Sequence, residues 1–462
     1  MKKRFIIFWG YIFIIFLNVS CLKTIDEPEQ GTVGKEIIIP DENFNTNTQN
    51  ITVTFAVSIT FSNGQTIVNN PFEEWGVKVS VDKQNVTITS TITDIEVNYV
   101  LAGKTSNGFV KIYSDYRFGL FFNGVSILNP TGAAINIQSG KRVSVMLVDK
   151  TANRLIDGGT FEMVEDERMN GTFYSEGQLI FDGNGSLTVY GNDGHAICVR
   201  DYIRIKRGNI TVNNATSDGI HCRDYFEMND GNVVINAQSD GVECTNGYIT
   251  IEGGTMKTKS GNKGLKTAEN LTITGGRIEI ESLDDGIRAE SNLVFTGGDI
   301  YCYSSKNGIV STQGAVAISG GLVVASGVKN VFSCGDFFSI TGGTAIGVGS
   351  ATFLPTAREC KQQTVVWGAS GFTAGQAINI KSSGNTDVLV FKLPQTYSNN
   401  MALVYTSPLL QANTNYTIFK GGTVTGGSNF HGLYTGAVSN GGTSAASFTT
   451  SNMVTTVGNV VF

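Results

Sequence analysis

Charged side chains are scarce in this chain of 462 residues. They make up 16% of the sequence, against ~25% in an average globular protein. The formal net charge of −6 argues against a protein that follows a nucleic-acid backbone, so we expect no nucleic-acid partner. Proline is also rare, with 7 residues, which excludes a collagen-like chain and proline-rich linkers. Hydrophobic residues still account for 41%, which excludes general disorder.

Two common kinds of chemical motif are missing as well. None of the 7 cysteines belongs to a C-x-x-C pair, which argues against a zinc or redox centre. The 3 histidines, His195, His221 and His431, form no Ser/His/Asp pattern that can be recognised in the sequence. Any function must therefore rest on other residue types or on groups that only the fold brings together.

The N-terminus predicts export. An apolar run of 13 residues from Phe5 to Leu17 follows the basic residues 2–4. A bilayer span takes about 20 residues, so this run predicts a signal peptide over residues 1–21. Its end, Ser20-Cys21, resembles a bacterial lipobox, in which Cys21 becomes the acylated first residue of the mature protein. An ordinary signal peptide with an incidental cysteine is the alternative.

The polar residues 22–50 then predict a flexible tether between the lipid and the fold. Acidic residues soon after the cysteine are typical of lipoproteins displayed on the bacterial cell surface; here they are Asp26, Glu27 and Glu29. We therefore expect an outer-membrane lipoprotein, held to the membrane by its lipid anchor and exposed at the cell surface.

Glycine is abundant, with 56 residues, about 12% against a usual ~7%. Many of these glycines fall into two series with one spacing of 22 or 23 residues. One series follows aspartate, lysine or asparagine, at Gly219, Gly241, Gly264, Gly286 and Gly308. The other comprises Gly231, Gly254, Gly276, Gly298, Gly321 and Gly343. Two series with a common period of this length predict a solenoid.

Each period contains three short runs in which apolar residues alternate with polar ones, which predicts three strands per coil. The sequence therefore predicts an all-β fold, a right-handed parallel β-helix with coils of ~22 residues over residues 51–345. Residues 346–462 lose the period but keep strand-like runs, and predict a C-terminal β module that caps the solenoid. Cys222, Cys244 and Cys302 fall at inward positions, which favours buried thiols, although a bridge between the first two is also compatible with the spacing.

Several segments resemble a known family. They are FNGVSI (122–127), GAAI (132–135), KGLKTA (263–268) with LTITGG (271–276), DDGI (284–287) and GLYTG (432–436). The sequence is similar to bacterial carbohydrate-binding domain-containing β-helix proteins of the cellulose- and pectin-binding clostridial type, from about residue 51 to the end. The resemblance implies non-catalytic polysaccharide binding, bound calcium and a relationship to calcium-dependent β-helical pectate lyases.

A column of outward side chains on successive coils is the candidate binding strip. It reads Tyr174, Cys198, His221, Glu243, Lys266, Arg288 and Val310. In this strip Tyr174 would stack on a sugar, and His221, Glu243, Lys266 and Arg288 would meet polar groups of the chain, with the two cations facing uronate carboxylates. Alternatively, these residues form a solvated face in which Glu243 and Lys266 pair with each other.

Aspartates before the repeat glycines are the candidate metal ligands. Asp218 and Asp240 are expected one coil apart, where two carboxylates repel unless a cation lies between them. Calcium prefers carboxylate and carbonyl oxygens, so we expect a calcium ion at these two residues, aided by Asp224. A second, weaker site is expected at Asp284 and Asp285. The alternative is that these aspartates only accept hydrogen bonds from turn amides, with Lys263 neutralising Asp240 and Asp285.

The sequence thus predicts a cell-surface lipoprotein that binds plant-type or acidic polysaccharide, is stabilised by calcium and performs no catalysis. A calcium-dependent pectate-type lyase is the first alternative, with Lys266 as the base that removes the proton next to a uronate carboxylate. Glu243 beside Lys266 argues against that role, because it raises the pKa of the lysine. A surface adhesin or a purely structural protein is the second alternative.

Overall fold

The computed structural model describes residues 37–40, 44–162, 164–165 and 167–462. The predicted signal peptide and Cys21 lie outside the described residues, as does most of the predicted tether. Residues 44–50 carry no regular secondary structure. No helix among the described residues is both long enough and apolar enough to cross a membrane.

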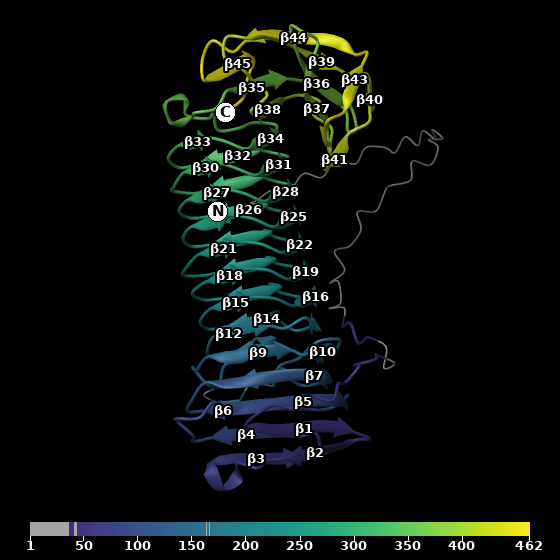
Figure 1. The fold of residues 1–462 in the computed structure, drawn as a ribbon, viewed down its shortest axis with the longest axis vertical. Coiled ribbons are helices and arrows are strands. Elements are labelled where there is room, and N and C mark those ends of the chain that lie inside the picture. Colours follow the sequence, from purple (N-terminus) through teal and green to yellow (C-terminus); the bar gives the residue numbers. More distant parts are fainter. Residues whose placement is uncertain (1–36, 41–43, 163, 166) are drawn as a thin grey trace, which may run out of the picture. The chain divides into compact units, whose positions relative to one another are not determined.

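The described chain is almost entirely β-structure and winds into a stack of coils (Figure 1). The stack has three faces, and the strands within each face are parallel. This confirms the predicted all-β parallel β-helix. Face 1 holds the strands that precede the second glycine series, together with the strands that stack on them in the earlier coils. They are β9 (Val143–Leu147), β12 (Leu179–Asp182), β15 (Ile203–Ile205), β18 (Phe226–Met228), β21 (Ile249–Ile251), β24 (Leu271–Ile273), β27 (Leu293–Phe295), β30 (Val316–Ile318) and β33 (Phe338–Ile340).

Face 2 holds the strands that follow the second glycine series, together with the strands that stack on them in the earlier coils. Its strands are β10 (Ala152–Asp157), β13 (Ser186–Gly191), β16 (Asn209–Ala215), β19 (Asn232–Ala237), β22 (Thr255–Ser260), β25 (Arg277–Ser282), β28 (Asp299–Ser304), β31 (Leu322–Gly327) and β34 (Thr344–Gly349). Face 3 holds the strands that follow the first glycine series, together with the strands that stack on them in the coils before and after. Its strands are β6 (Phe109–Ser114), β8 (Ile135–Ile137), β11 (Gly171–Ser175), β14 (His195–Val199), β17 (Ile220–Cys222), β20 (Val242–Cys244), β23 (Leu265–Thr267), β26 (Ile287–Ala289), β29 (Ile309–Ser311) and β32 (Phe332–Cys334).

Glycine makes the sharp corner between faces 1 and 2. Gly254 and Gly276 have φ of 76° and 84°, a region that L-residues with a side chain adopt only at a cost. A Cβ at Gly276 would also lie 2.9 Å from the carbonyl oxygen of Gly254 in the coil before it. The second glycine series is therefore required both by backbone conformation and by the close stacking of coils.

Alternating side chains fill the interior. Residues such as Ile251, Ile273 and Ile280 are fully buried, while the residues between them point outward. Burial of one such side chain contributes roughly 1.5–3 kcal/mol, so the stack of coils provides its own core. Cys222 and Cys244 lie in this interior with their Sγ atoms 2.8 Å apart, and both are free thiols, as are the other described cysteines.

The N-terminal end is closed by two antiparallel hairpins, β1 (Ala56–Ser62) with β2 (Gln65–Asn69), and β3 (Val77–Asp82) with β4 (Asn85–Ser90). The short 3-10 helix η1 (Glu73–Trp75) lies between them. β5 (Asn98–Thr105) and the long β7 (Phe118–Asn129) then connect the hairpins to the regular coils.

The C-terminal module begins where coil stacking stops. β38 (Met401–Thr406) pairs antiparallel with β34 and with β35 (Thr364–Ala369), and β45 (Val454–Gly458) joins β35. The short 3-10 helix η2 (Ala357–Glu359) precedes β35. The other strands of the module are β36 (Ala377–Ser382), β37 (Asp387–Lys392), β39 (Asn415–Lys420), β40 (Thr423–Thr425), β41 (Ser428–Phe430), β42 (Leu433–Thr435), β43 (Val438–Asn440) and β44 (Thr443–Thr449). The module lies at the end of the stack in Figure 1.

Candidate functional site

The outward column predicted from the sequence runs along face 3. The middle residues of neighbouring strands are paired in register: His221 opposite Glu243, Glu243 opposite Lys266, and Lys266 opposite Arg288. All four are partly exposed. The period-two strands and the constant coil length together produce this alignment, because each inward pair leaves one outward residue between its members.

Tyr174 belongs to the same column but is not accessible. It is fully buried, packed with Ala133 and Cys198 and covered by Phe161 and Met169 from the segment that connects β10 and β11. A ring buried in this way cannot stack on a sugar, so Tyr174 has to be removed from the predicted strip. The physical reason is the long connection before β11, which folds over face 3.

Asp218 and Asp240, at two Asp-Gly turns, accept hydrogen bonds from backbone amides of the next coil. The N–H of Asp240 donates to Asp218 Oδ1 at 2.9 Å, and the N–H of Lys263 donates to Asp240 Oδ1 at 2.8 Å. Asp218 and Asp240 are 3% and 2% exposed. The predicted alternative, in which these aspartates accept hydrogen bonds from turn amides, therefore holds for one oxygen of each carboxylate. The other oxygen of each carboxylate contacts different partners.

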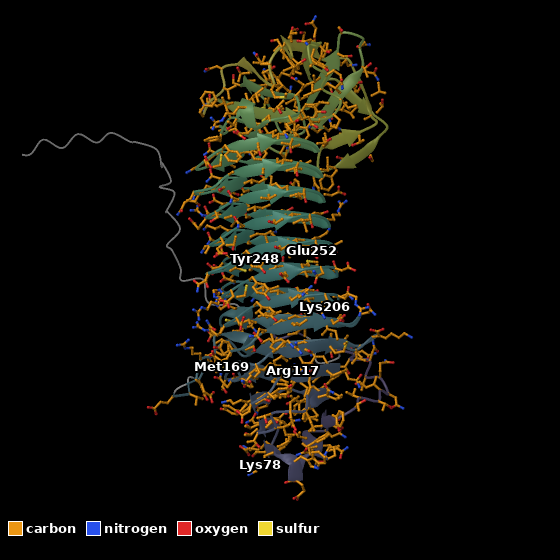
Figure 2. The ribbon with its side chains drawn as sticks, turned by 60° about the vertical axis from the view of Figure 1, so that its left-hand side comes forward. Lys78, Arg117, Met169, Lys206, Tyr248 and Glu252 are labelled. Atoms are coloured by element: carbon orange, nitrogen blue, oxygen red, sulfur yellow. The ribbon has the colours of Figure 1, made fainter. Side chains whose placement is uncertain are left out.

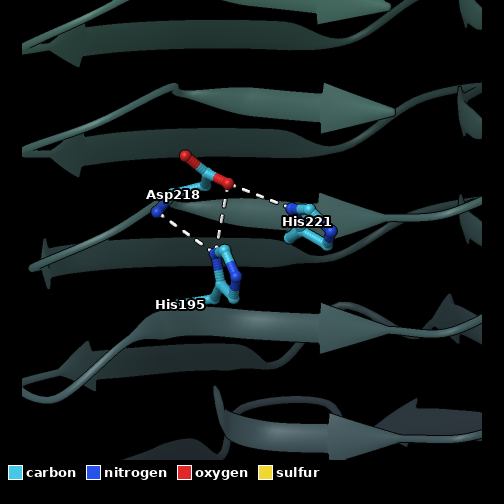
Figure 3. A group of neighbouring side chains, drawn as sticks. All are labelled: His195, Asp218 and His221. Carbon is cyan, nitrogen blue, oxygen red and sulfur yellow. Dashed lines mark hydrogen bonds and ion pairs between the residues drawn. The ribbon is translucent and has the colours of Figure 1, made fainter. Parts of the chain in front are cut away.

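The second oxygen of Asp218 contacts both members of a stacked pair of imidazole rings (Figure 3). Oδ2 is 3.2 Å from Nδ1 of His195 and 3.0 Å from Nδ1 of His221. Burial opposes ionisation of Asp218, but the hydrogen bonds from the two histidines hold its pKa well below the usual range. Burial alone would lower the pKa of His221, yet its hydrogen bonds to Asp218 and Glu243 raise that pKa to about 9.

Glu243 and Lys266 extend this network. Glu243 Oε2 lies 3.1 Å from His221 Nδ1, and the hydrogen bond from His221 keeps the pKa of Glu243 low despite burial. Lys266 donates a hydrogen bond to Glu243, and its Nζ is 3.6 Å from Asp240 Oδ2. Burial opposes the charge of Lys266, but the hydrogen bond to Glu243 raises the pKa of this lysine, as the sequence predicted.

Three carboxylates thus converge on one place. Ligand atoms of Asp218, Asp240 and Glu243 all lie within 4.8 Å of one another. Two oxygens bound to one calcium ion at 2.3–2.6 Å are at most about 5 Å apart, so the spacing is compatible with such an ion. A second group, His195, Asp218 and His221, meets the same distance limit. Burial raises the pKa of Asp240, so a further cation would stabilise the ionised form of this carboxyl group.

Asp224 does not join this group. It is exposed in the turn that follows β17, whereas Asp218 precedes that strand, so the two carboxylates are at opposite ends of β17. Asp224 instead neighbours Asp201, and this neighbour contributes to the raised pKa of Asp201, which burial mainly causes. The proposed help of Asp224 to the calcium site is therefore wrong, because the strand separates the two turns.

Asp284 and Asp285 already have cationic partners. Asp284 pairs with Lys263 at 2.9 Å and with Lys306 at 2.6 Å. Asp285 pairs with Arg288 at 3.0 Å. The sequence predicted that Lys263 would neutralise Asp240 and Asp285, but its ammonium group contacts Asp284 and only its backbone meets Asp240. These pairs leave no uncompensated carboxylate for the weaker second calcium site.

A polar depression beside the column was not predicted. It has a volume of about 310 Å³ and lies at the carboxyl ends of β14, β17 and β20, where Arg200, Arg223, Asn170 and Asn246 join His221. Arg200 and Arg223 each precede an aspartate one coil apart, at 201 and 224. That repeated Arg-Asp pair is the sequence signal for the depression, but the sequence alone does not show that the arginines face the column.

A second missed feature is a ladder of tyrosines at the corner between faces 3 and 1. Tyr202 and Tyr225 stack with centroids 4.3 Å apart, and Tyr225 and Tyr248 at 4.9 Å. Tyr248 and Glu252, which flank β21, are labelled in Figure 2. The signal is present in the sequence as a tyrosine one residue before three successive face 1 strands.

A family model and a curated protein are similar to this chain in sequence. The model of the carbohydrate-binding domain-containing protein family matches residues 82–284 and 262–390, which together are more than half of the chain. A carbohydrate-binding domain-containing protein of Acetivibrio thermocellus is 34% identical over 118 residues, 25% of this chain and 41% of that protein, so the match spans less than half of the relative.

One solved structure is also similar. It is described as the polysaccharide lyase-like protein from C. thermocellum in a gadolinium derivative, with 25% identity, 52% of this chain and 96% of that chain covered, and a TM-score of 0.46. The family match is the decisive comparison, because it covers most of the coils that carry the outward column. The chain belongs to the family of carbohydrate-binding domain-containing proteins, as its sequence segments predicted.

Proposed function

We propose that the protein binds acidic polysaccharide along face 3 and does not cleave it. The observation that carries this proposal is a row of cationic side chains beside the three carboxylates of Asp218, Asp240 and Glu243. Lys266 and Arg288 lie on neighbouring strands in register, and Arg200 and Arg223 line the depression on the same face. Guanidinium and ammonium groups at coil spacing are suited to successive uronate carboxylates, because such charge-assisted hydrogen bonds are strong and directional.

We also propose that calcium binds at Asp218, Asp240 and Glu243. The support is the convergence of three carboxylates within 4.8 Å and the near-complete burial of two of them. When bound, the ion would neutralise these carboxylates and offer coordination to an acidic sugar. His221 and Lys266 contact the same oxygens, so calcium has to compete with two protein cations for them.

The absence of cleavage is proposed from the state of Lys266. A lyase base has to accept a proton at working pH, and a lysine does so only when its pKa is lowered. Here Glu243 and Asp240 raise the pKa of Lys266, which keeps the amine protonated. The lyase alternative predicts ultraviolet absorbance from an unsaturated product when polygalacturonate and calcium are added. We expect none, and absorbance that disappears in Lys266→Ala would overturn the proposal.

Affinity electrophoresis in gels with polygalacturonate tests the binding face. We expect the double variant Lys266→Ala/Arg288→Ala to lose at least about tenfold in affinity, or ~1.4 kcal/mol. Lys206→Ala is the matched control, because Lys206 is an exposed lysine at the end of face 1 (Figure 2). Retention of full affinity in the double variant, with circular dichroism unchanged, would refute a binding role for face 3. A glycan array that shows no binding would favour the adhesin or structural alternative.

Titration calorimetry of calcium-stripped protein tests the metal. We expect calcium to bind and to raise the melting temperature, because a ligand of the folded state stabilises it. Asp240→Asn should abolish binding, whereas Lys266→Gln should tighten it about tenfold by removing a competing cation. No binding to the wild-type protein, or tighter binding in both variants, would exclude calcium from these carboxylates.

The surface location remains part of the proposal. The sequence motif at Ser20-Cys21 supports a lipid anchor on Cys21, and the proposed ligand is a polymer that is met outside the cell. Metabolic labelling with a radioactive fatty acid should mark the wild-type protein and leave Cys21→Ser unlabelled. Equal labelling of both proteins would contradict the anchor.

A further inference from the structure

A groove of about 550 Å³ follows the corner between faces 2 and 3, away from the column described above. It extends over five coils, from β16 to β28. The residues that line it are Asn214, Asn236, Ala237, Gln238, Lys259, Ser260, Gly261, Glu281, Ser282, Leu283, Tyr303 and Ser305. Nothing in the proposed function uses this groove.

Four polar side chains of the groove have unused hydrogen-bonding capacity. Asn236, Gln238, Lys259 and Glu281 are exposed, and the described part of the chain offers their side chains no hydrogen bond or ion pair. On face 3, by contrast, every outward polar residue from His221 to Arg288 is engaged. Four unengaged polar side chains in one groove are available to a ligand.

Apolar surface lies among these polar groups. Leu283 is 69% exposed, although large apolar side chains are usually covered. The ring of Tyr303 borders the groove, and its hydroxyl is held at 3.3 Å by Gln395 of the C-terminal module. The floor includes Gly261, where a Cβ would lie 2.1 Å from the carbonyl oxygen of Gln238, so this position stays without a side chain. Such a mixture suits a ligand with both hydroxyl groups and C–H faces.

The groove has a repeat of its own. Asn236, Lys259, Glu281 and Tyr303 are paired in register on β19, β22, β25 and β28. Neighbouring parallel strands are ~4.8 Å apart, so the four side chains form a straight row of about 14 Å along the stack. The rise of one coil is similar to the length of one sugar unit in an extended chain, so successive sugars could meet equivalent positions.

We propose that this groove binds one extended, uncharged polysaccharide chain along the axis of the coils. Among the described residues, Lys259 and Glu281 are the only charged ones that line it, and their charges cancel, which disfavours a polyanion. Amide side chains suit sugar hydroxyls, and Leu283 and Tyr303 suit the C–H face of a pyranose ring. The inference is independent of the acidic polymer assigned to face 3. Two sites on separate surfaces would let one molecule hold two kinds of chain.

Calorimetry with β-1,4-linked hexasaccharides of glucose, mannose and xylose tests the proposal on the full chain. We expect at least one of them to bind without calcium. Asn236→Ala/Gln238→Ala should weaken that binding at least tenfold. The matched control Gln313→Ala, an exposed glutamine outside the groove, and the face 3 variant Lys266→Ala/Arg288→Ala should leave it unchanged.

The outcomes separate this proposal from the one for face 3. Loss of polygalacturonate binding in the face 3 variant alone would leave the groove unaffected, and loss of hexasaccharide binding in the groove variant alone would support it. The proposal is overturned if no uncharged hexasaccharide binds the wild-type protein at millimolar concentration. It is also overturned if the groove variant, with an unchanged melting temperature, binds as well as the wild type.

Discussion

Aspartates of similar sequence context perform different tasks in this solenoid. Asp218 and Asp240 are buried and bind turn amides of the next coil. Asp284 also stands at an Asp-Gly turn, but it is partly exposed and pairs with two lysines. The difference arises from the neighbours in the coils above and below, which the local sequence around each aspartate does not contain.

The two lysines at Asp284 make acid sensitivity testable. Burial opposes the charge, but the hydrogen bonds from Lys306 and Lys263 lower the pKa of Asp284 to about 2 from 3.8. A depressed pKa stabilises the fold fully above the unfolded value, and this contribution is lost as pH falls from about 4 to about 2. We therefore expect Asp284→Asn to lower the melting temperature at pH 6 and to have little effect at pH 2. Asp299→Asn, at an exposed aspartate, is the control. An equal decrease at both pH values would contradict the ion-pair explanation.

At the level of the coil, the glycine corner between faces 1 and 2 sets the geometry. A residue with a Cβ in this left-handed conformation costs about 1–2 kcal/mol. In Gly276→Ala the new Cβ would also press on backbone atoms of Gly253 and Gly254. We expect Gly276→Ala to reduce the free energy of unfolding by more than about 2 kcal/mol, measured by urea denaturation.

Gly375 provides the matched control for this prediction. Its φ is 75°, and an added Cβ would have no atom within 4 Å. Gly375→Ala should therefore show only the backbone cost. Equal effects of the two substitutions would mean that coil stacking does not require glycine at the corner.

The strands and their register were predictable because the signal repeats. Period-two alternation determines which side chains face outward, and the spacing of 22 or 23 residues places His221, Glu243, Lys266 and Arg288 in one column, which the strand register confirms. The predictions are wrong where the repeat is interrupted or where a long side chain has several partners within reach. Tyr174 is buried by an irregular connection. Lys263 pairs with Asp284, and this pairing depends on how far the lysine side chain reaches.

The C-terminal module covers the end of the solenoid and part of face 2. Val324 and Ile346 of the last coils share one apolar cluster with Leu403 and Phe391 of the module. The module also reaches back along the stack, where His431 stacks on Tyr301 with ring centroids 3.6 Å apart. Gln395 of the module also accepts a hydrogen bond from the hydroxyl of Tyr303, which borders the groove. The module that caps the stack therefore also contacts a residue that borders the groove.

Removal of the module tests capping at the scale of the whole molecule. A chain that ends after residue 349 would leave the hydrogen-bonding edge of β34 without β38 and would expose Ile346 and Val348. An uncovered strand edge pairs with other chains, so we expect the truncated protein to self-associate in analytical ultracentrifugation. Tyr301→Ala keeps β38 in place and removes only the stacking partner of His431, so it should remain in the oligomeric state of the wild type. If the truncated protein stays in that state with an unchanged melting temperature, the solenoid closes its own end and the module is not a cap.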